Sequence, residues 1–307
     1  MALNINQQIT ELFTRSSHIL LTTSATDSGD GLASLLALKL FLNKLNKPAD
    51  LIITEELAHK FSFLFGAENI KISADPLRRL IVTLDIKNNK VKEFNYDIQG
   101  EELKIYITPE QAEFKKENVS VSASDYAYDL IVVVGCPDLE ALGTLYFEHP
   151  DFFFQTTIIN IDNNPGNERY GQINEIDLNV SSCSEITLQL ISGSHPELIN
   201  KEIATNLLAG LITKTDNFRS PTITPESLHA ASSLMKLGAD QAYIINNLNK
   251  NKSLTALNLW GRVLARLKQD SHYKMAWSLV SQNDFQKSGG SITDLNGVVS
   301  ELISRSP

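Results

Sequence analysis

Apolar runs alternate with amphipathic stretches along most of the chain. Short runs made almost entirely of apolar residues are typical of strands that are buried on both faces of a parallel sheet. The strands expected from these runs are 18–24, 51–54, 129–134 and 156–162. Elsewhere apolar residues recur at helical spacing. The helices expected from that spacing are 6–15, 32–45, 59–65, 184–192, 198–213, 224–237, 239–248 and 254–267. Strands that alternate with helices predict an α/β fold with a doubly wound parallel sheet.

The stretch 79–108 has a different pattern. Apolar and polar residues alternate over 80–86, 91–98 and 103–107, with a turn signal at Asn88–Asn89 and Gly100 between the last two runs. This pattern is typical of antiparallel strands joined by tight turns. We expect an antiparallel meander inserted into the α/β domain, within residues 79–124.

The same pattern suggests a division into three parts. We expect an α/β domain over 1–215, a helical connector over 216–270, and the start of a second small α/β domain over 271–307. The last part rests on an expected strand at 274–280 and an expected helix at 293–303.

Charge and composition narrow the classes of partner. The formal net charge is −9, with 42% hydrophobic and 21% charged residues. An acidic chain does not supply the clustered Lys and Arg that long nucleic acids need, although a small nucleotide or another phosphorylated ligand fits a local pocket. No run is long and apolar enough to cross a bilayer. The two cysteines suit reduced, packed thiols. We therefore expect a cytoplasmic protein without a membrane partner, and a homodimer is compatible with the sequence.

Four polar segments follow expected strands or end an expected helix. In a doubly wound sheet such segments meet at one rim and form sites. They are also rich in Asp, Asn, Ser and Gly, which commonly cap helices and make turns. The segments are 24–30, 135–138, 162–165 and 213–216. The residues alone leave both interpretations open.

The order and spacing of these segments resemble the four motifs of the DHH-superfamily phosphoesterases, in the branch of nanoRNases, pAp phosphatases and RecJ-like exonucleases. The family's His-x-x-Pro-Asp-x-Asp-Ala is similar to Ser24 through Gly31, and its Asp-His-His-Pro is similar to Asp162 through Pro165. The family's strand that ends in Asp ends here in Gly135, and its Thr-Asp-Thr-Gly-x-Phe is similar to 213–218. Four ordered motifs are more specific than any one of them. The resemblance covers nearly the whole chain and implies the family's fold.

The resemblance also implies a pair of divalent metal ions, usually manganese, that activate water and clamp a phosphoryl group. The family's ligand positions correspond here to Ser24, Ser28, Asp30, Gly135, Asn163 and Lys214. Only Asp30 keeps the family residue. Gly135 has no side chain, and the amine of Lys214 should repel a cation. The positions equivalent to the family's catalytic residues are Asp30, Asp162, Asn163 and Asn164.

The family also has a C-terminal domain with a glycine-rich, histidine-containing substrate loop near its end. Residues 271–307 resemble only the beginning of that domain. The resemblance therefore implies that this domain is truncated here.

Three hypotheses follow. The first is a descendant without metal that binds phosphate through Lys214 and Arg219, together with Ser34 and backbone N–H groups after Asp30. In that case no cofactor is expected. Its rival is that Lys214 only forms a salt bridge with Asp30 or Asp162.

The second hypothesis is an active, metal-dependent phosphodiesterase or phosphatase with a rebuilt Mn²⁺ or Mg²⁺ site. The carboxylates available for it are Asp27, Asp30, Asp138, Asp162 and Asp216. The third hypothesis is a structural partner that binds through a strand edge of the meander. Whether the chain is an enzyme stays open between them.

Overall fold

The chain forms two compact units, residues 1–239 and 240–307, and each is described here by itself. The structure is a computed structural model that describes residues 4–74, 77–87, 89–111, 113–250, 254–270, 272–295 and 298. These units differ from the three parts expected from the sequence, because the helix at 225–236 packs on the helix at 201–214 and so belongs to the first unit.

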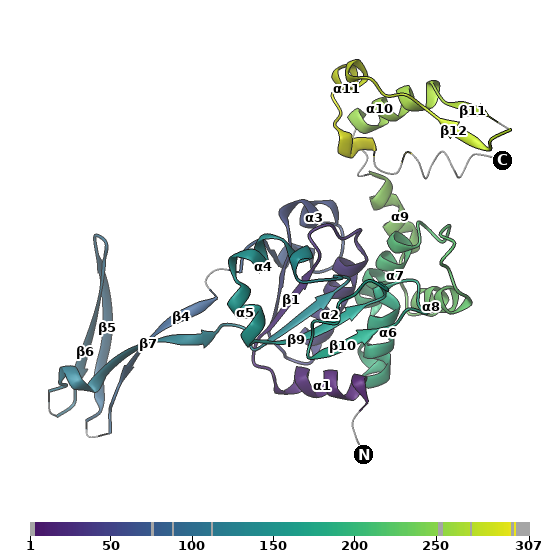
Figure 1. The fold of residues 1–307 in the computed structure, drawn as a ribbon. Coiled ribbons are helices and arrows are strands. Elements are labelled where there is room, and N and C mark those ends of the chain that lie inside the picture. Colours follow the sequence, from purple (N-terminus) through teal and green to yellow (C-terminus); the bar gives the residue numbers. More distant parts are fainter. Residues whose placement is uncertain are drawn as a thin grey trace. The chain divides into compact units, whose positions relative to one another are not determined.

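A six-stranded parallel sheet forms the centre of the first unit (Figure 1), and its strand order is β10-β9-β8-β1-β2-β3. The strands are β1 (Ile19–Thr23), β2 (Ala49–Ile52), β3 (Ile70–Lys71), β8 (Leu130–Val134), β9 (Thr157–Asp162) and β10 (Ile173–Ile176). The four strands expected from apolar runs are confirmed. The short outer strands β3 and β10 were not expected, because neither contains a run of buried apolar residues.

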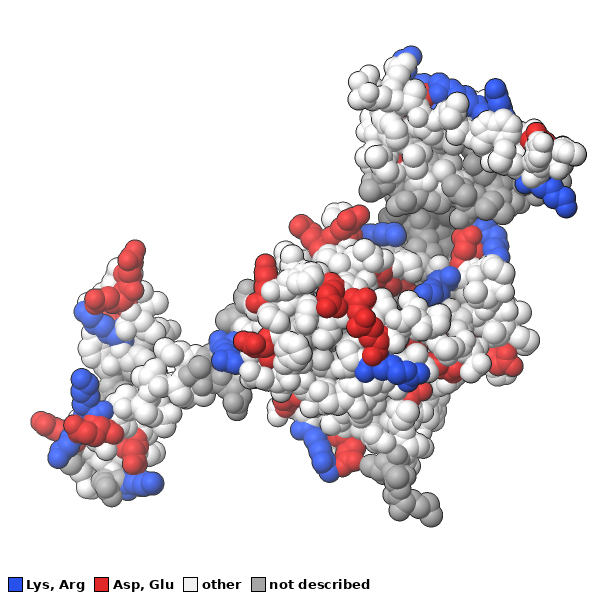
Figure 2. All heavy atoms as spheres, viewed as in Figure 1, with Lys and Arg blue, Asp and Glu red and all other residues white. Residues whose placement is uncertain are grey.

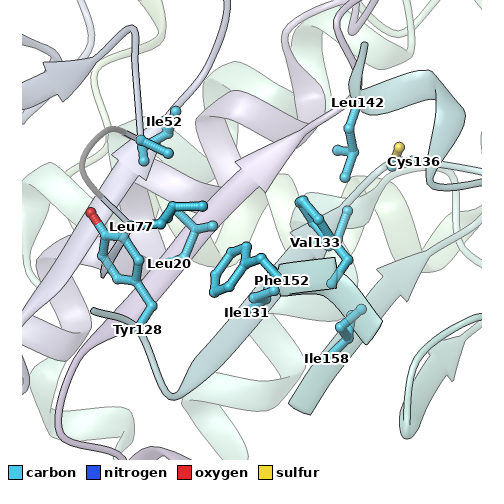
Figure 3. Packing of buried hydrophobic residues seen from close by; sticks show 12 residues of the cluster. Leu20, Ile52, Leu77, Tyr128, Ile131, Val133, Cys136, Leu142, Phe152 and Ile158 are labelled. Carbon is cyan, nitrogen blue, oxygen red and sulfur yellow. The ribbon is translucent and has the colours of Figure 1, made fainter. Parts of the chain in front are cut away.

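Helices cover both faces of this sheet, as the predicted doubly wound fold requires. On one face Phe152 packs with Leu20 of β1, Ile131 of β8 and Ile158 of β9 (Figure 3). The intervening strand residues point to the opposite face. Helix α2 packs on β1, β2 and β8, α6 packs on β9, and α7 packs against both helices.

The helices of the first unit are α1 (Ile5–Arg15), α2 (Asp30–Lys44), α3 (Glu55–Lys60), α4 (Thr144–Glu148), α5 (Pro150–Gln155), α6 (Cys183–Ser194), α7 (Lys201–Lys214) and α8 (Pro225–Lys236). Short 3-10 helices lie at Ala67–Asn69, Glu140–Leu142 and Pro196–Leu198. The helix expected at 59–65 begins earlier, after Thr54, and ends at Lys60. Helices α4 and α5 were missed because Gly143, His149 and Pro150 divide them into one- to two-turn pieces.

The inserted region is an arm of two antiparallel ribbons, so the predicted antiparallel insertion is confirmed, although its strands pair in a nested order and not in the consecutive order of a meander. Strand β4 (Arg78–Leu84) pairs with β7 (Val119–Tyr126), while β5 (Val91–Gln99) and β6 (Glu102–Pro109) form a hairpin between them. A 3-10 turn, Lys116–Asn118, precedes β7. The nested pairing was missed because local alternation does not show which strands pair, and the partners of β4 lie about forty residues further along the chain. At the base of the arm, Tyr126 packs edge-to-face against Phe152, with ring centroids 4.9 Å apart.

The second unit is small and has its own apolar contacts. Its helices and strands are α9 (Gln241–Lys250), α10 (Leu254–Ala265), β11 (Lys268–Asp270), β12 (Met275–Trp277), α11 (Gln282–Ser288) and a 3-10 helix at Ile292–Leu295. Trp260 and Val263 of α10 pack with Val298. Buried Asp284 accepts hydrogen bonds from Arg266.

In this second unit the strand expected at 274–280 is shorter and pairs with an unexpected partner, β11. Helix α11 was also not expected. The helix expected at 293–303 begins as a 3-10 turn, and most of its remainder lies outside the described residues.

The charge on the surface is mixed. Figure 2 shows Lys and Arg interspersed with Asp and Glu over the viewed face of the first unit. Among the described residues, no helix has both the length and the apolar composition that spanning a membrane requires.

Candidate functional site

The strand order places a switch point between β1 and β8. From β1 the chain adds β2 and β3 on one side, and from β8 it adds β9 and β10 on the other. Because ligands of such sheets bind outside the carboxyl ends of the strands at a switch point, the loops after Thr23, Val134 and Asp162 are the candidate site. Three of the four predicted segments lie on these loops, and the fourth ends helix α7. We call this region the rim.

Asp27 caps the helix that starts at the rim. Its carboxylate accepts hydrogen bonds from the backbone N–H groups of Gly29 (2.9 Å), Gly31 (3.2 Å) and Leu32 (3.0 Å). These donors have no partner within the helix, so the carboxylate fixes the start of α2. Burial nevertheless raises the pKa of Asp27, while the backbone hydrogen bonds and Lys214 work to lower it. The capping interpretation is therefore correct for this residue.

Asp30 is enclosed by the start of helix α6, and only 2% of it is exposed. One carboxylate oxygen accepts the N–H of Cys183 (2.7 Å). The other accepts the N–H (3.1 Å) and the hydroxyl (2.8 Å) of Ser184. A helix N-terminus favours an anion, and here the anion is supplied by the chain itself. Burial raises the pKa of Asp30, and the nearby Asp27 carboxylate raises it further.

Ser34 lies within the same helix contact. Its hydroxyl hydrogen-bonds to the hydroxyl of Ser184 (2.9 Å), and its side chain is fully buried. It therefore helps to join α2 to α6, and the substrate-binding role expected for it stays a prediction. Gly210 of α7 also packs against Ser184. A Cβ at position 210 would lie only 2.1 Å from the Ser184 hydroxyl, so the contact leaves no room for a side chain.

Asp162 ends β9 with its carboxylate held by its own loop, and it is also only 2% exposed. One oxygen accepts the N–H groups of Asn163 (2.8 Å) and Asn164 (3.2 Å). The other accepts the side-chain amide of Asn167 (2.8 Å), which also donates to the backbone oxygen of Cys136 (3.0 Å).

The two asparagines after Asp162 also make local hydrogen bonds. The side chain of Asn163 donates to the backbone oxygen of Val180 (3.2 Å). The side-chain oxygen of Asn164 accepts the N–H of Gly166 (2.9 Å), which forms a turn. These contacts orient the loop and, at neutral pH, offer no imidazole for acid–base chemistry.

The thiol of Cys183 lies between the two acidic residues. Its sulfur lies 3.8 Å from an oxygen of Asp162 and 3.7 Å from the side-chain oxygen of Asn163. Burial raises the pKa of this thiol well above its ordinary value, with Asp30 adding to the shift, so the thiol stays protonated and donates. Gly135, at φ +66°, lies beside it, and an added Cβ would be in ordinary van der Waals contact with the sulfur, at 3.6 Å.

The remaining positions of the first motif contribute little to a metal site. Ser24 is buried, and its hydroxyl accepts the N–H of Thr26 (3.2 Å). Ser28 is exposed.

Lys214 is the last residue of α7 and is exposed. Its charge lowers the pKa values of Asp27 and Asp30, against the larger effect of burial. No ion pair joins its amine to any carboxylate in the described part of the chain, so the rival salt bridge to Asp30 or Asp162 does not form.

Arg219 is already paired. Its guanidinium donates to the carboxylate of Asp216 (3.0 Å) and to the backbone oxygen of the same residue (3.1 Å). Between Lys214 and Arg219, the three residues 216–218 all have positive φ (47°, 56° and 62°). The structure therefore gives Arg219 a local partner and leaves Lys214 as the cation at this end of α7.

The donor set at the rim does not fit a pair of divalent ions. Within the described ranges, no group of three or more His, Cys, Asp or Glu side chains could hold a metal. Both oxygens of Asp30 and of Asp162 accept hydrogen bonds from the protein itself, and Gly135 contributes no donor. Of the carboxylates considered for a rebuilt site, Asp138 accepts the N–H of Ala141 (2.8 Å).

Sequence reasoning placed Asp30 and Asp162 at the rim but gave no role to the residues that surround them. Cys183, Ser184 and Asn167 complete the hydrogen bonding of these two carboxylates. A usable signal was present, because the Ser-Ser-Cys-Ser-Glu start of a helix exposes free N–H groups that attract an anion.

Comparisons with known proteins agree with this fold. No protein-family profile matches the chain. It is 32% identical over 108 residues to the bifunctional oligoribonuclease and PAP phosphatase NrnA of Thermus thermophilus, which covers 35% of this chain and 33% of that protein. It is 26% identical over 151 residues to the probable protein of the same name from Streptococcus mutans, which covers 43% of this chain and 47% of that protein. The aligned part thus spans a third to about half of these relatives.

The fold itself is found in a crystal structure of an exopolyphosphatase-related protein from Bacteroides fragilis. The TM-score is 0.72 at 19% identity, over 98% of this chain and 76% of that one. The fold and the rim together define a doubly wound α/β protein with its candidate site at the carboxyl ends of the strands. The sequence relatives and the shared fold support the resemblance to the DHH-superfamily phosphoesterases.

Proposed function

We propose that this chain is a DHH-superfamily protein that binds a small phosphorylated ligand, such as a nucleotide, at the rim without a metal pair. The observation that carries the proposal is the state of Asp30. It is the only ligand position that keeps the family residue, and its two oxygens accept three hydrogen bonds from α6. A metal would have to displace these donors, whose loss in a buried site costs about 1–3 kcal/mol each.

Lys214 supplies the positive charge for such a ligand. Its amine is exposed and lies close enough to Asp27 and Asp30 to lower their pKa values. The backbone N–H groups expected to assist it are engaged, because Gly29, Gly31 and Leu32 donate to Asp27. Arg219 contributes only if a phosphate displaces Asp216, an exposed pairing that is weak.

The test is thermal unfolding in the presence of a chelator, with and without 3'-phosphoadenosine-5'-phosphate or a short RNA dinucleotide. Ligand binding should raise the melting temperature by mass action. Lys214→Ala should remove that rise. Lys236→Ala is the matched control, because Lys236 is also the exposed last residue of a helix, α8. No rise with any ligand in the wild-type protein would contradict the proposal.

The alternative is retained metal-dependent hydrolysis, supported by the activities named for the NrnA relatives. It predicts bound metal after purification and turnover of either substrate with Mn²⁺, abolished in Asp30→Ala. Our proposal predicts neither metal nor turnover. Because Asp30 also holds α6 in place, the folding of the variant is checked by circular dichroism before its activity is compared.

A further inference from the structure

The β5–β6 hairpin of the arm is amphipathic. Strand register places apolar residues opposite each other on one face, in the pairs Phe94–Ile107, Tyr96–Ile105 and Ile98–Leu103. The alternate positions form a polar face, with the pairs Asn95–Tyr106, Asp97–Lys104 and Gln99–Glu102. We call the first set the apolar face of the hairpin. Such alternation is typical of a sheet with one side against a core and the other in water.

Within the first unit, the described residues leave most of the apolar face uncovered. The exposed fraction is 62% for Phe94, 67% for Tyr96, 67% for Ile98 and 61% for Leu103. Isolated two-stranded ribbons are marginally stable, and a contiguous apolar patch on a monomer marks an interaction surface. Within the first unit the hairpin thus resembles one half of a packed structure.

A second copy of the same hairpin fits the size of this surface. Phe and Tyr each bury roughly 150–250 Å² when fully covered, so the six apolar side chains at their present exposure offer on the order of 600 Å² per copy. A standard interface buries about 800 Å² per partner, so this face alone supplies most of what a specific dimer needs.

The distribution of charge also favours a second copy of the chain as the partner of this face. Residues 78–126 contain eight Lys and Arg against nine Asp and Glu, a net charge of −1, which leaves −8 for the rest of the chain. Two copies that meet elsewhere would bring acidic surfaces together, whereas the arms meet with almost no net charge. The polar face also carries both signs, at Asp97 and Lys104, and remains in water when the apolar faces are joined.

We propose that two copies of this chain associate through the apolar faces of their β5–β6 hairpins, packed face to face across a twofold axis. Two sheets packed in this way interdigitate their inner side chains about 10 Å apart. Each copy presents the same surface to the other, which is the isologous contact of a cyclic dimer. The inference is independent of the function proposed for the rim.

The test is the molar mass in solution of the full chain, by sedimentation or light scattering over a concentration series. The wild-type protein should be a dimer at tens of micromolar. Tyr96→Glu should be a monomer, with its dimer dissociation constant raised at least 100-fold. Asn95→Glu is the matched control, because it adds the same charge one residue away, on the polar face of the same strand, and should remain a dimer.

A mixing experiment tests whether the two faces meet each other. Tyr96→Glu and Tyr96→Lys should each be monomeric, and their equimolar mixture should recover dimers, because the Tyr96–Ile105 pair is the middle one of the apolar face and the two introduced charges are then opposite in sign and close to the axis. A wild-type monomer at 100 µM would overturn the proposal, even if the protein bound vesicles or another protein. A dimeric Tyr96→Glu, or a mixture that stays monomeric, would also overturn it.

Discussion

The rim of the sheet and the arm differ in how far their side chains find partners within the chain. At the rim, Asp30 and Asp162 have all of their carboxylate oxygens hydrogen-bonded within the chain. On the arm, Tyr96 and Ile98 are two-thirds exposed on a face built for packing. A polar site that is already satisfied makes any ligand compete with internal bonds, whereas an uncovered apolar face gains from a partner. This difference is the reason why we propose assembly through the arm and ligand binding without a metal pair at the rim.

The first way to break this comparison is to remove Asp30. Asp30→Ala should lower the free energy of unfolding by about 3 kcal/mol, because it leaves the N–H groups of Cys183 and Ser184 and the Ser184 hydroxyl without their acceptor. Denaturant unfolding in the presence of a chelator measures it. Asp151→Ala, an exposed carboxylate on α5, should change stability by less than about 0.5 kcal/mol. An Asp30→Ala variant as stable as the wild type would show that the carboxylate is kept for something other than the fold.

The second target is Asn167. Its side-chain amide donates to Asp162 and to the backbone oxygen of Cys136, so Asn167→Ala removes a donor from a buried carboxylate. We expect a loss of about 2 kcal/mol, since hydrogen bonds to charged groups contribute about 1.5–3 kcal/mol. Asn164→Ala, which breaks only an exposed turn, should cost clearly less in the same unfolding experiment. Equal losses would mean that Asp162 gains nothing from Asn167.

Whether a feature could be predicted from the sequence depends on how far apart along the chain its interacting residues lie. Strands β1, β8 and β9 were predictable because each is a run of residues buried on both faces. Strand β3 has only two residues and β10 is half-exposed, so the surrounding sheet determines them and no local pattern does. The arm was predictable as an antiparallel insertion, but the pairing of β4 with β7 joins residues about forty positions apart, as Leu80 with Ala123 shows.

The candidate site shows the same limit. The loops that carry Asp30 and Asp162 could be placed at the rim, because strand ends meet there in any doubly wound sheet. The partners of Asp30 lie more than 150 residues further along the chain, at the start of α6. Nothing in the spacing of the first motif indicates that its carboxylate points into that helix. Lys214 was identified as the local cation, but its lack of an ion pair required the coordinates.

The pH dependence of stability gives a smaller but directional effect. The pKa of Asp30 is raised by burial and by Asp27, and burial also raises the pKa of Asp27 and of Glu185. The folded protein therefore binds protons more tightly than the unfolded chain, and stability falls as pH rises from the ordinary values near 4 through the raised ones. Each group contributes at most about 1.4 kcal/mol per pH unit within that window.

Asp27→Asn should reduce this fall, because it removes one of the buried charges and the repulsion that this charge exerts on Asp30. Unfolding at a series of pH values between 4 and 7.5 measures it, with Asp151→Asn as an exposed control that should keep the wild-type profile. Burial raises the pKa of Asp50, but hydrogen bonds from Lys71 and Tyr128 outweigh this effect, so the pKa is lowered overall. The contribution of Asp50 to the free energy of unfolding therefore rises with pH only below this pH range. A wild-type stability that increases from pH 4 to 7 would contradict the assignment.

The smallest expected change in the folded chain lies on the arm. Because Tyr96 is 67% exposed, Tyr96→Glu should alter the unfolding free energy of the dilute, monomeric protein by less than about 0.5 kcal/mol. At high concentration the wild type should gain stability by mass action as dimers form, and the variant should not. The melting temperature should therefore depend on concentration in the wild type alone. If Tyr96→Glu destabilised the dilute monomer by more than about 1 kcal/mol, the apolar face would have to be packed within its own chain, and the contrast with the rim would fail.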